Sequence, residues 1–441
     1  MKVSISGIRG IFGVDFGLHD VSRFSRLFGS YISSTSNQLS CIIGRDGRPS
    51  GKIINDVVIA CLLEQGIDVY DLGIVPTPIL FREARKAGGA IMVTASHNPL
   101  EWNGLKMLIN GRGLYEEELN NILNNSINET KRPGKYYKIN STYIDDLIKF
   151  SPSSRLHQDF KVGLDCGGGA ACNYVHNLFE AYKIKYLSIN DAYGFSSRGP
   201  DPTSDPLDEL SELVKLNGLN FGFAFDMDGD RLVIVDGREG KLHPDLTLLL
   251  CVSGAISNNT KKFVISLDTS ISIEKYIKEH GGQVAYSKVG ESNVIKKMTE
   301  VEGEAGGEGS SGGYIVPSFS SCRDGLLASI TVCSINQQII KDCLTLASDF
   351  KQIRTKLPVR SETSLNDLLE KIFLVVKPHS SEVISDDGFK FILDDDAWVL
   401  VRSSNTEHVL RISMEAKTPQ IDSLYKLIYG KIYEVYEKKT Q

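Results

Sequence analysis

The feature that most constrains the fold of this chain is a repeated alternation of short apolar segments with segments of helical period. Residues 21–32 place apolar side chains at helical spacing, and residues 41–44 form a short apolar run that ends in glycine. A helix over residues 55–65 and strands over residues 68–72 and 90–94 follow. Strands separated by helices predict βαβ units around a mostly parallel sheet.

The same alternation begins again twice. The second round starts at the strand-like residues 161–165, and the third starts at residues 262–267. The other elements expected there are helices over residues 170–182, 273–280 and 294–301 and strands over residues 185–189, 221–225 and 283–287. No strict sequence repeat accompanies the pattern, but successive α/β units of about 100–150 residues each are of ordinary domain size.

The last part of the chain has a different pattern. Strand-like residues 383–384, 389–393, 397–402 and 409–415 follow one another closely, and an amphipathic helix is expected over residues 421–436. Clustered strands with a terminal helix predict a small α+β domain.

Composition limits the classes of function. The chain has 49 Lys and Arg against 55 Asp and Glu, and the net charge of −6 gives no basic surface for nucleic acid or an anionic membrane. Apolar runs such as residues 246–251 are far shorter than the ~20 residues of a membrane-spanning helix. The first residues lack the apolar core of a secretory signal. We therefore expect a cytoplasmic protein with no nucleic-acid and no membrane partner.

The eight cysteines do not suggest a metal or redox motif, because none of them forms Cys-x-x-Cys. In a reducing compartment such residues are usually small core side chains rather than disulfides. We expect them to be free and buried.

An acidic cluster follows an apolar strand directly, over residues 226–231 (DMDGDR). Carboxylates this close repel one another unless a cation compensates. In extended backbone, Asp226, Asp228 and Asp230 share one side and can face one ion, and an all-oxygen set suits Mg²⁺. An EF-hand is excluded, because the sixth residue of the cluster is Arg231 rather than glycine. Arg231 is a candidate phosphate ligand, and a solvated acidic turn is the alternative interpretation.

A polar loop over residues 94–99 (TASHNP) ends another apolar run. It places Ser96 at the carboxyl edge of a parallel sheet, where open α/β folds bind ligands. The alternative is a simple turn closed by proline. A Ser-His-Asp hydrolase fits poorly, because the chain has no Gly-x-Ser-x-Gly motif around this serine.

Two more loops carry polar groups suited to a phosphorylated sugar. Residues 306–313 (GGEGSSGG) combine glycines, which allow close approach of a ligand, with a carboxylate and hydroxyls. Residues 402–407 (RSSNTE), with Arg411 beyond, offer guanidinium, hydroxyl and amide donors for a phosphate. A flexible Gly/Ser loop and a polar hairpin tip are the alternatives. Lys106 is either a surface lysine or a proton-transfer group.

Together, and in this order, the motifs resemble those of the α-D-phosphohexomutase family. The resemblance is greatest to its archaeal and bacterial phosphomannomutase/phosphoglucomutase and phosphoglucosamine mutase branch. The matching stretches are residues 6–10, 44–48, 75–78, 94–99, 226–231, 288–290, 306–310 and 402–407. The resemblance implies an α/β protein with domains around a central cleft. Related α/β domains with mixed sheets would span residues 1–153, 154–255 and 256–365, and a smaller α+β domain would span residues 366–441.

The activity implied is an intramolecular phosphotransfer, of the isomerase class, between hexose 1-phosphate and hexose 6-phosphate. Ser96 would carry the phosphate, and the sugar would pass through a bisphosphate. Mg²⁺ would be bound by Asp226, Asp228, Asp230 and a phosphate oxygen on Ser96. A sugar bisphosphate would serve as activator, and the protein would be a monomer or a homodimer.

The resemblance also implies roles for side chains in other loops. The residues implied around the reacting phosphate are Arg9, His97, Lys106 and Arg231. Those implied to read the sugar hydroxyls are Lys288, Gly290, Glu291, Glu308 and Ser310. Those implied to clamp the other phosphate are Arg402, Ser404, Asn405, Thr406 and Arg411.

The chain departs from the family pattern in several places. Ser403 and His408 stand where proline is usual, and Glu291 stands where relatives often carry Asp or His. Ser310 and Ser311 occupy the place of one residue, so either serine can be the sugar contact.

Rival interpretations stay open. A phosphoglucosamine mutase would use the same scaffold, and no residue distinguishes glucose, mannose and glucosamine phosphates. A haloacid-dehalogenase-like phosphatase would use an Asp of the acidic cluster as nucleophile, but it leaves the serine and Arg402 loops unexplained. A non-catalytic sugar-phosphate-binding protein is a further alternative.

Overall fold

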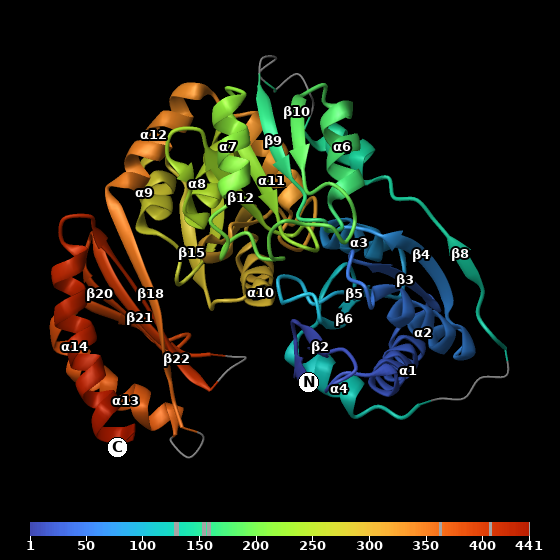
Figure 1. The fold of residues 1–441 in the computed structure, drawn as a ribbon. Helices are drawn as coiled ribbons and strands as arrows, with labels where there is room; N and C mark the ends of the chain where they lie inside the picture. The colour runs from blue at the N-terminus through green and yellow to red at the C-terminus, as the bar shows by residue number, and fades with distance from the viewer. Residues whose placement is uncertain (128–131, 152–155, 157–159, 361–363, 405–407, 441) are drawn as a thin grey trace.

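The computed structural model describes residues 1–127, 132–151, 156, 160–360, 364–404 and 408–440. Its strands form four sheets in chain order, and the parts built on them are called units 1 to 4. In Figure 1 the units follow an arc, with blue unit 1 at one end and red unit 4 at the other. The predicted fold, α/β units followed by a smaller α+β unit, is confirmed.

Unit 1 is built on a mixed sheet with the strand order β1-β2-β6-β5-β3-β4-β8, and β7 pairs with β6. Strand β3 is parallel to β4 and β5, whereas β6 is antiparallel to β2 and β5. The strands are β1 (Lys2–Ser4), β2 (Gly7–Ile11), β3 (Ser40–Arg45), β4 (Asp68–Ile74), β5 (Gly89–Val93), β6 (Trp102–Ile109), β7 (Arg112–Gly113) and β8 (Tyr136–Lys138). The helices are α1 (Leu18–Thr35), α2 (Gly51–Glu64), α3 (Thr77–Glu83), α4 (Glu116–Leu123) and α5 (Tyr143–Phe150).

Unit 2 has the sheet order β10-β9-β11-β12-β13, in which the β9 pairs are parallel and the β12 pairs antiparallel. Its strands are β9 (Lys161–Asp165), β10 (Lys185–Ile189), β11 (Phe221–Phe225), β12 (Leu232–Asp236) and β13 (Gly240–Lys241). The helices α6 (Cys172–Ala181) and α7 (Asp208–Leu216) connect its parallel strands. Helix α8 (Pro244–Ser257) follows β13 and packs mainly against elements of unit 3. The predicted strand over residues 221–225 is therefore confirmed as β11.

Unit 3 has the mixed sheet order β15-β14-β16-β17. Its strands are β14 (Lys262–Ser266), β15 (Gln283–Ser287), β16 (Ala305–Glu308) and β17 (Gly313–Ile315). Its helices are α9 (Ile271–Glu279), α10 (Glu291–Val301), α11 (Gly325–Cys333) and α12 (Gln337–Ser348).

Unit 4 is an antiparallel sheet, in the order β18-β22-β21-β20-β19, packed against helices. Its strands are β18 (Phe350–Pro358), β19 (Glu382–Ile384), β20 (Phe389–Asp394), β21 (Ala397–Ser403) and β22 (Val409–Lys417). Its helices are α13 (Leu365–Val376) and α14 (Ile421–Thr440).

The apolar cores show how the units are joined. One buried cluster runs through units 1 to 3 and includes Ile79, Phe223 and Ile330. Unit 4 has a core of its own, and a small cluster that includes Ile271 and Trp398 joins it to unit 3. Units 1 to 3 therefore share a large apolar cluster in addition to smaller clusters of their own, whereas unit 4 is attached through fewer apolar side chains.

Two expectations about the whole chain can be compared with this fold. All eight cysteines are free and buried, as predicted. Within the described residues, no helix combines the length and the apolar character needed to cross a membrane.

Candidate active site

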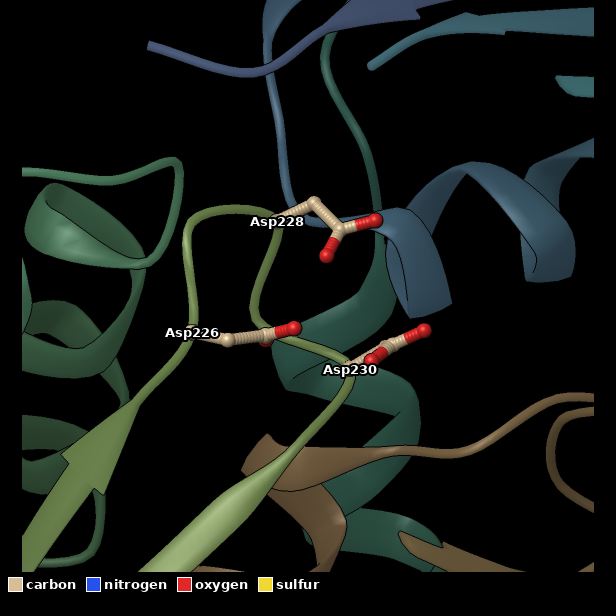
Figure 2. A group of neighbouring side chains, drawn as sticks. All are labelled: Asp226, Asp228 and Asp230. Atoms are coloured by element: carbon tan, nitrogen blue, oxygen red, sulfur yellow. The ribbon is translucent and has the colours of Figure 1, made fainter. Parts of the chain in front are cut away.

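The acidic cluster lies in the tight connection between β11 and β12. Asp226, Asp228 and Asp230 are buried, and one carboxylate oxygen from each lies within 4.8 Å of the others. Figure 2 shows their carboxylates turned toward a common space. The backbone here is a turn with Gly229 at φ +70°, so the prediction of an extended segment was wrong. The turn, rather than strand alternation, brings the carboxylates together.

The carboxylates present unpartnered oxygens to this space. Thr77 donates to Oδ2 of Asp228 at 2.7 Å, and Arg323 donates to Oδ2 of Asp230 at 2.7 Å. The Oδ1 atoms of both aspartates are buried without a hydrogen-bond partner. Buried acceptors are rarely left unsatisfied, and carboxylate oxygens are the ligands of hard divalent cations. The residues present therefore fit Mg²⁺.

The electrostatics of the cluster also favour a cation. Burial and the charges of Asp230 and Asp228 raise the pKa of Asp226 well above its ordinary value. Burial and Asp230 raise the pKa of Asp228 as well. Burial acts in the same sense on Asp230, but Arg323, Lys106 and Arg231 outweigh it and lower its pKa. A bound cation would relieve the repulsion that opposes ionisation of the first two carboxyls.

Ser96 reaches this cluster from unit 1, on the loop that follows β5. Its hydroxyl donates to Oδ2 of Asp226 across 3.5 Å and lies 3.3 Å from Nδ1 of His97. The residue has φ +52°, in the left-handed region that is costly for a non-glycine residue. Arg48 supports this conformation, because its guanidinium donates to the backbone carbonyls of Ser96 and Asn98. The loop is thus held with the serine hydroxyl against the acidic cluster.

Positive charge surrounds the serine. Nη2 of Arg231 lies 2.9 Å from Nδ1 of His97, and Arg231 also pairs with Asp201 at 3.5 Å. The charge of Arg231, burial and Arg9 lower the pKa of His97 to about 2, so its ring is neutral. Arg9 donates to Oδ1 of Asn98 at 3.5 Å. These groups form a cationic frame around Ser96.

An ion-pair network links this frame to unit 3. Nζ of Lys106 donates to Oε1 of Glu291 at 2.9 Å, and Arg323 contacts Glu291, Glu308 and Asp230. Burial lowers the pKa of Arg323, but these carboxylates outweigh it and raise the pKa well above its usual value. Arg323 could not be predicted from the sequence, because one arginine before an apolar helix carries no signal of its own.

The expected sugar-binding loops meet at this network. Oε1 of Glu308 accepts a hydrogen bond from the backbone of Gly290 at 2.8 Å. Ser311 is buried and donates to the carbonyl of Glu308, whereas Ser310 is half-buried. Lys288 is exposed.

The glycines of the unit 3 loop have a different role from the one expected. Gly306 and Gly307 have φ +152° and +148°, and a Cβ on either would lie within 2 Å of a neighbouring strand's carbonyl oxygen. They are needed for close packing of β16 in the sheet. This packing need accounts for Gly306 and Gly307, and close approach of a ligand to the loop stays a prediction.

Unit 4 contributes two of the predicted clamp arginines, and Arg411 faces unit 1. Arg411 lines a cavity of about 350 Å³ together with Arg9 and His97, and its Nε donates to Oγ of Ser404 at 3.2 Å. Nε of Arg402 lies 3.9 Å from Asp387, whose carboxylate also accepts a hydrogen bond from the backbone of Val289 at 3.0 Å. The predicted clamp residues Asn405 and Thr406 lie outside the described residues.

Comparisons with known proteins agree with this arrangement. Family models described as Phosphoglucomutase/phosphomannomutase alpha/beta/alpha domains I, II and III and C-terminal domain match residues 1–133, 141–240, 243–353 and 360–424. The chain is 32% identical to the "Probable phosphoglucosamine mutase" of Methanosphaera stadtmanae, with 96% of each chain covered. It is 30% identical to the phosphoglucomutase/phosphomannomutase of Thermococcus kodakarensis, with 94% of each covered.

A solved structure shows the same fold. The crystal structure of a phosphoglucomutase/phosphomannomutase family protein from Burkholderia thailandensis aligns with a TM-score of 0.84 at 24% identity. The alignment covers 99% of this chain and 98% of that one. The chain therefore belongs to the phosphoglucomutase/phosphomannomutase family of α-D-phosphohexomutases.

Proposed function

We propose that this protein is a phosphohexomutase that interconverts hexose 1-phosphate and hexose 6-phosphate, with Ser96 as the phosphate carrier. The observation that carries the proposal is the approach of the Ser96 hydroxyl to Asp226, across 3.5 Å, within a cationic frame. The residues come from units 1 and 2, so only the folded chain brings them together.

The reaction requires two phosphoryl transfers. In the first, the C6 oxygen of hexose 1-phosphate attacks the phosphorus on Ser96, the bond from phosphorus to the serine oxygen breaks, and the proton of the C6 hydroxyl passes, net, to the serine oxygen. The resulting bisphosphate turns around. In the second, the serine oxygen attacks the phosphorus of the 1-phosphate, the bond from that phosphorus to the C1 oxygen breaks, and the serine proton passes, net, to the C1 oxygen of the departing hexose 6-phosphate. Phosphoryl transfer depends mainly on positioning and on stabilising the charge of the transferring group.

The residues around Ser96 supply that stabilisation. We assign Arg9, His97 and Arg231 to the oxygens of the transferring phosphoryl group. The neutral His97 ring can donate through its second nitrogen while Nδ1 accepts from Arg231. Burial lowers the pKa of Lys106, but Glu291 and Asp230 outweigh this and raise it. Lys106 is therefore charged at neutral pH. We assign it to proton transfer between the serine oxygen and the sugar oxygen.

The acidic cluster would hold Mg²⁺ through Asp226, Asp228 and Asp230, together with a phosphate oxygen on Ser96. Bound there, Mg²⁺ would neutralise charge on the transferring phosphoryl group. A sugar bisphosphate would act as activator, because serine must carry a phosphate before the first turnover.

The sugar and its far phosphate would bind units 3 and 4. We assign Lys288, Gly290, Glu291, Glu308 and Ser310 to the sugar. Ser310 is preferred over Ser311, because the hydroxyl of Ser311 already donates to the carbonyl of Glu308. The assigned clamp of the far phosphate consists of Arg402, Ser404, Asn405, Thr406 and Arg411.

A second candidate concerns the sugar. The relative that is 32% identical is named as a phosphoglucosamine mutase, whereas another at 30% is named for glucose and mannose phosphates. Coupled assays with glucose, mannose and glucosamine 1-phosphates, each with Mg²⁺ and a trace of the matching bisphosphate, would rank kcat/KM. A preference of about 10-fold or more corresponds to about 1.4 kcal/mol of transition-state binding and would identify the substrate. Absence of turnover with any of them would refute the mutase proposal.

The phosphatase alternative makes a different chemical prediction. It places the covalent phosphate on an aspartate of the acidic cluster. A phosphoaspartate is cleaved by hydroxylamine, whereas phosphoserine resists it. The protein would be treated with labelled sugar phosphate and then with hydroxylamine. Labelled phosphate that remains and maps to Ser96 would support the mutase. Labelled phosphate on Asp226 or Asp228 would refute Ser96 as the phosphate carrier.

A further inference from the structure

Arg323 contacts both the acidic cluster and the sugar-binding loops. It directly precedes Asp324, the N-cap residue of α11. Its Nη2 lies 2.7 Å from Asp230, its Nη1 lies 3.3 Å from Glu308, and its Nε lies 3.3 Å from Glu291. Its side chain is only 12% exposed. One guanidinium thus holds carboxylates that belong to different parts of the site.

The contact with Asp230 leaves the other oxygen of that carboxylate available. Arg323 uses Oδ2, whereas Oδ1 is buried without a hydrogen-bond partner. A cation in the cluster and Arg323 can therefore bind the same carboxylate through different oxygens. A side chain that binds the other oxygen of a metal-binding carboxylate fixes the orientation of that carboxylate. Loss of such a side chain commonly weakens metal binding about 10–100-fold.

The other side of Arg323 fixes the sugar loops. Its backbone amide donates to Oε2 of Glu291 at 3.0 Å, so main chain and side chain both hold this carboxylate. Oε1 of Glu308 in turn binds the backbone of Gly290. The planar fork of a guanidinium can satisfy several carboxylates in fixed directions, which the single ammonium of a lysine cannot do.

We propose that Arg323 is a positioning residue that couples metal binding at the acidic cluster to sugar recognition by the loops of Glu291 and Glu308. This inference rests on the proposed mutase function. A cation that orders Asp230 also orders Arg323, and with it both sugar-loop carboxylates. By linkage, a bound sugar phosphate strengthens metal binding by the same factor.

The test measures that factor directly. Titration calorimetry would give the affinity of the purified protein for Mg²⁺, with and without a saturating hexose phosphate. Kinetics would give the KM of hexose 1-phosphate at limiting and saturating Mg²⁺. The coupling factor is the ratio by which a bound hexose phosphate strengthens Mg²⁺ binding. For the wild type we expect it to be about 5-fold or more, and we expect Mg²⁺ to strengthen the binding of hexose phosphate by the same factor.

The variants separate positioning from charge. Arg323→Gln is expected to weaken Mg²⁺ binding about 10-fold and to bring the coupling factor close to 1. Arg323→Lys keeps a positive charge among the buried carboxylates, so this variant is expected to fold. Its affinity for Mg²⁺ should lie between those of Arg323→Gln and the wild type, but its coupling factor should stay close to 1. Arg112→Gln is the matched control, because Arg112 also forms a bidentate pair, with Glu118 at 2.8 Å, outside the site. It should keep the wild-type factor.

Other outcomes overturn the inference. If Arg323 only competes with the metal as a positive charge, Arg323→Gln will bind Mg²⁺ more tightly. An unchanged coupling factor in Arg323→Lys would also refute it, even if Arg323→Gln does not fold. A wild-type protein without mutase activity would instead refute the proposed function, so the two failures are distinguishable.

Discussion

The hydroxyl of Thr77 donates to Oδ2 of Asp228 at 2.7 Å, although the two residues are 151 positions apart in the chain. The backbone amide of Thr77 also donates to the carbonyl of Asp228, at 2.8 Å. Unit 1 therefore holds one carboxylate of the acidic cluster by side chain and main chain together. This contact occupies Oδ2 of Asp228 and leaves its buried Oδ1 without a hydrogen-bond partner.

We predict that Thr77→Val weakens Mg²⁺ binding about 10-fold, because a hydrogen bond to a charged carboxylate is worth about 1.5–3 kcal/mol. Valine keeps the volume, and the backbone contact remains. Titration calorimetry with Mg²⁺ alone would measure the loss. Thr77→Ser retains the hydroxyl and serves as the control, so equal affinities of the two variants would contradict the prediction.

Ser96→Ala is expected to abolish turnover while leaving the binding of hexose phosphate measurable. Alanine removes the atom that carries the phosphate but none of the groups that bind sugar. Activity would be followed in a coupled assay, and binding by calorimetry. Ser311→Ala, which removes a nearby internal hydroxyl, should retain turnover. Undiminished activity of Ser96→Ala would refute the carrier role.

Asp226→Asn is expected to separate folding stability from metal binding. Burial and the charges of Asp230 and Asp228 disfavour the ionised form of Asp226, as the raised pKa of this carboxyl indicates. The amide removes this repulsion, so the Tm of the metal-free variant should rise at pH 7. Mg²⁺ at 100 times its Kd should raise the free energy of unfolding of the wild type by about 2.7 kcal/mol. In Asp226→Asn this stabilisation should disappear.

Thermal unfolding with EDTA and with Mg²⁺ would measure both effects. The control is Asp56→Asn, which changes an aspartate on the surface of α2 that pairs with Lys52. This variant should keep the full response to Mg²⁺. A wild-type response to Mg²⁺ in Asp226→Asn would argue against the acidic cluster as the metal site.

The junction of units 3 and 4 contains a buried lysine. Lys390 is 2% exposed, and its ammonium lies 4.7 Å from the ring centroid of Tyr286 and 4.5 Å from that of Trp398. Burial lowers its pKa from 10.5 to about 8, although Glu274, Glu415 and Asp268 favour the charge. Between these pH values the unfolded chain binds more protons, so the free energy of unfolding should rise with pH there.

Lys390→Met should therefore stabilise the protein at pH 7, by on the order of 2 kcal/mol, and this advantage should shrink as the pH approaches 10. Denaturant titrations at both pH values would measure it. Lys417→Met is the contrasting control, because a hydrogen bond to Asp396 raises the pKa of Lys417 and its removal should not stabilise. A pH-independent effect of Lys390→Met would contradict the assignment of a buried charge.

Much of the site could be predicted because its chemistry is local in sequence. A buried strand that ends in a polar loop places that loop at a sheet edge, and this rule gave the loops of Ser96 and Asp226. The boundaries between the units stay a prediction, as does the oligomeric state. The roles of Arg402, Asn405 and Thr406 stay predictions as well.

Contacts across the chain explain what the sequence analysis missed. The 44–48 and 75–78 stretches resembled the family, but only the structure shows Arg48 under the serine loop and Thr77 on Asp228. Arg323 carried no pattern at all, because its partners lie in three separate segments.

The sequence by itself determined the alternation of strands and helices and the residue types at each strand end, since both depend on neighbours within a few positions. Only the tertiary structure decided which strand ends meet, because that depends on the packing of units 1 to 3 around one shared core. The approach of Ser96 to Asp226, over 130 positions of chain, is of this second kind. Its geometry follows from burial of apolar surface contributed by units 1 to 3 together, which no local pattern encodes.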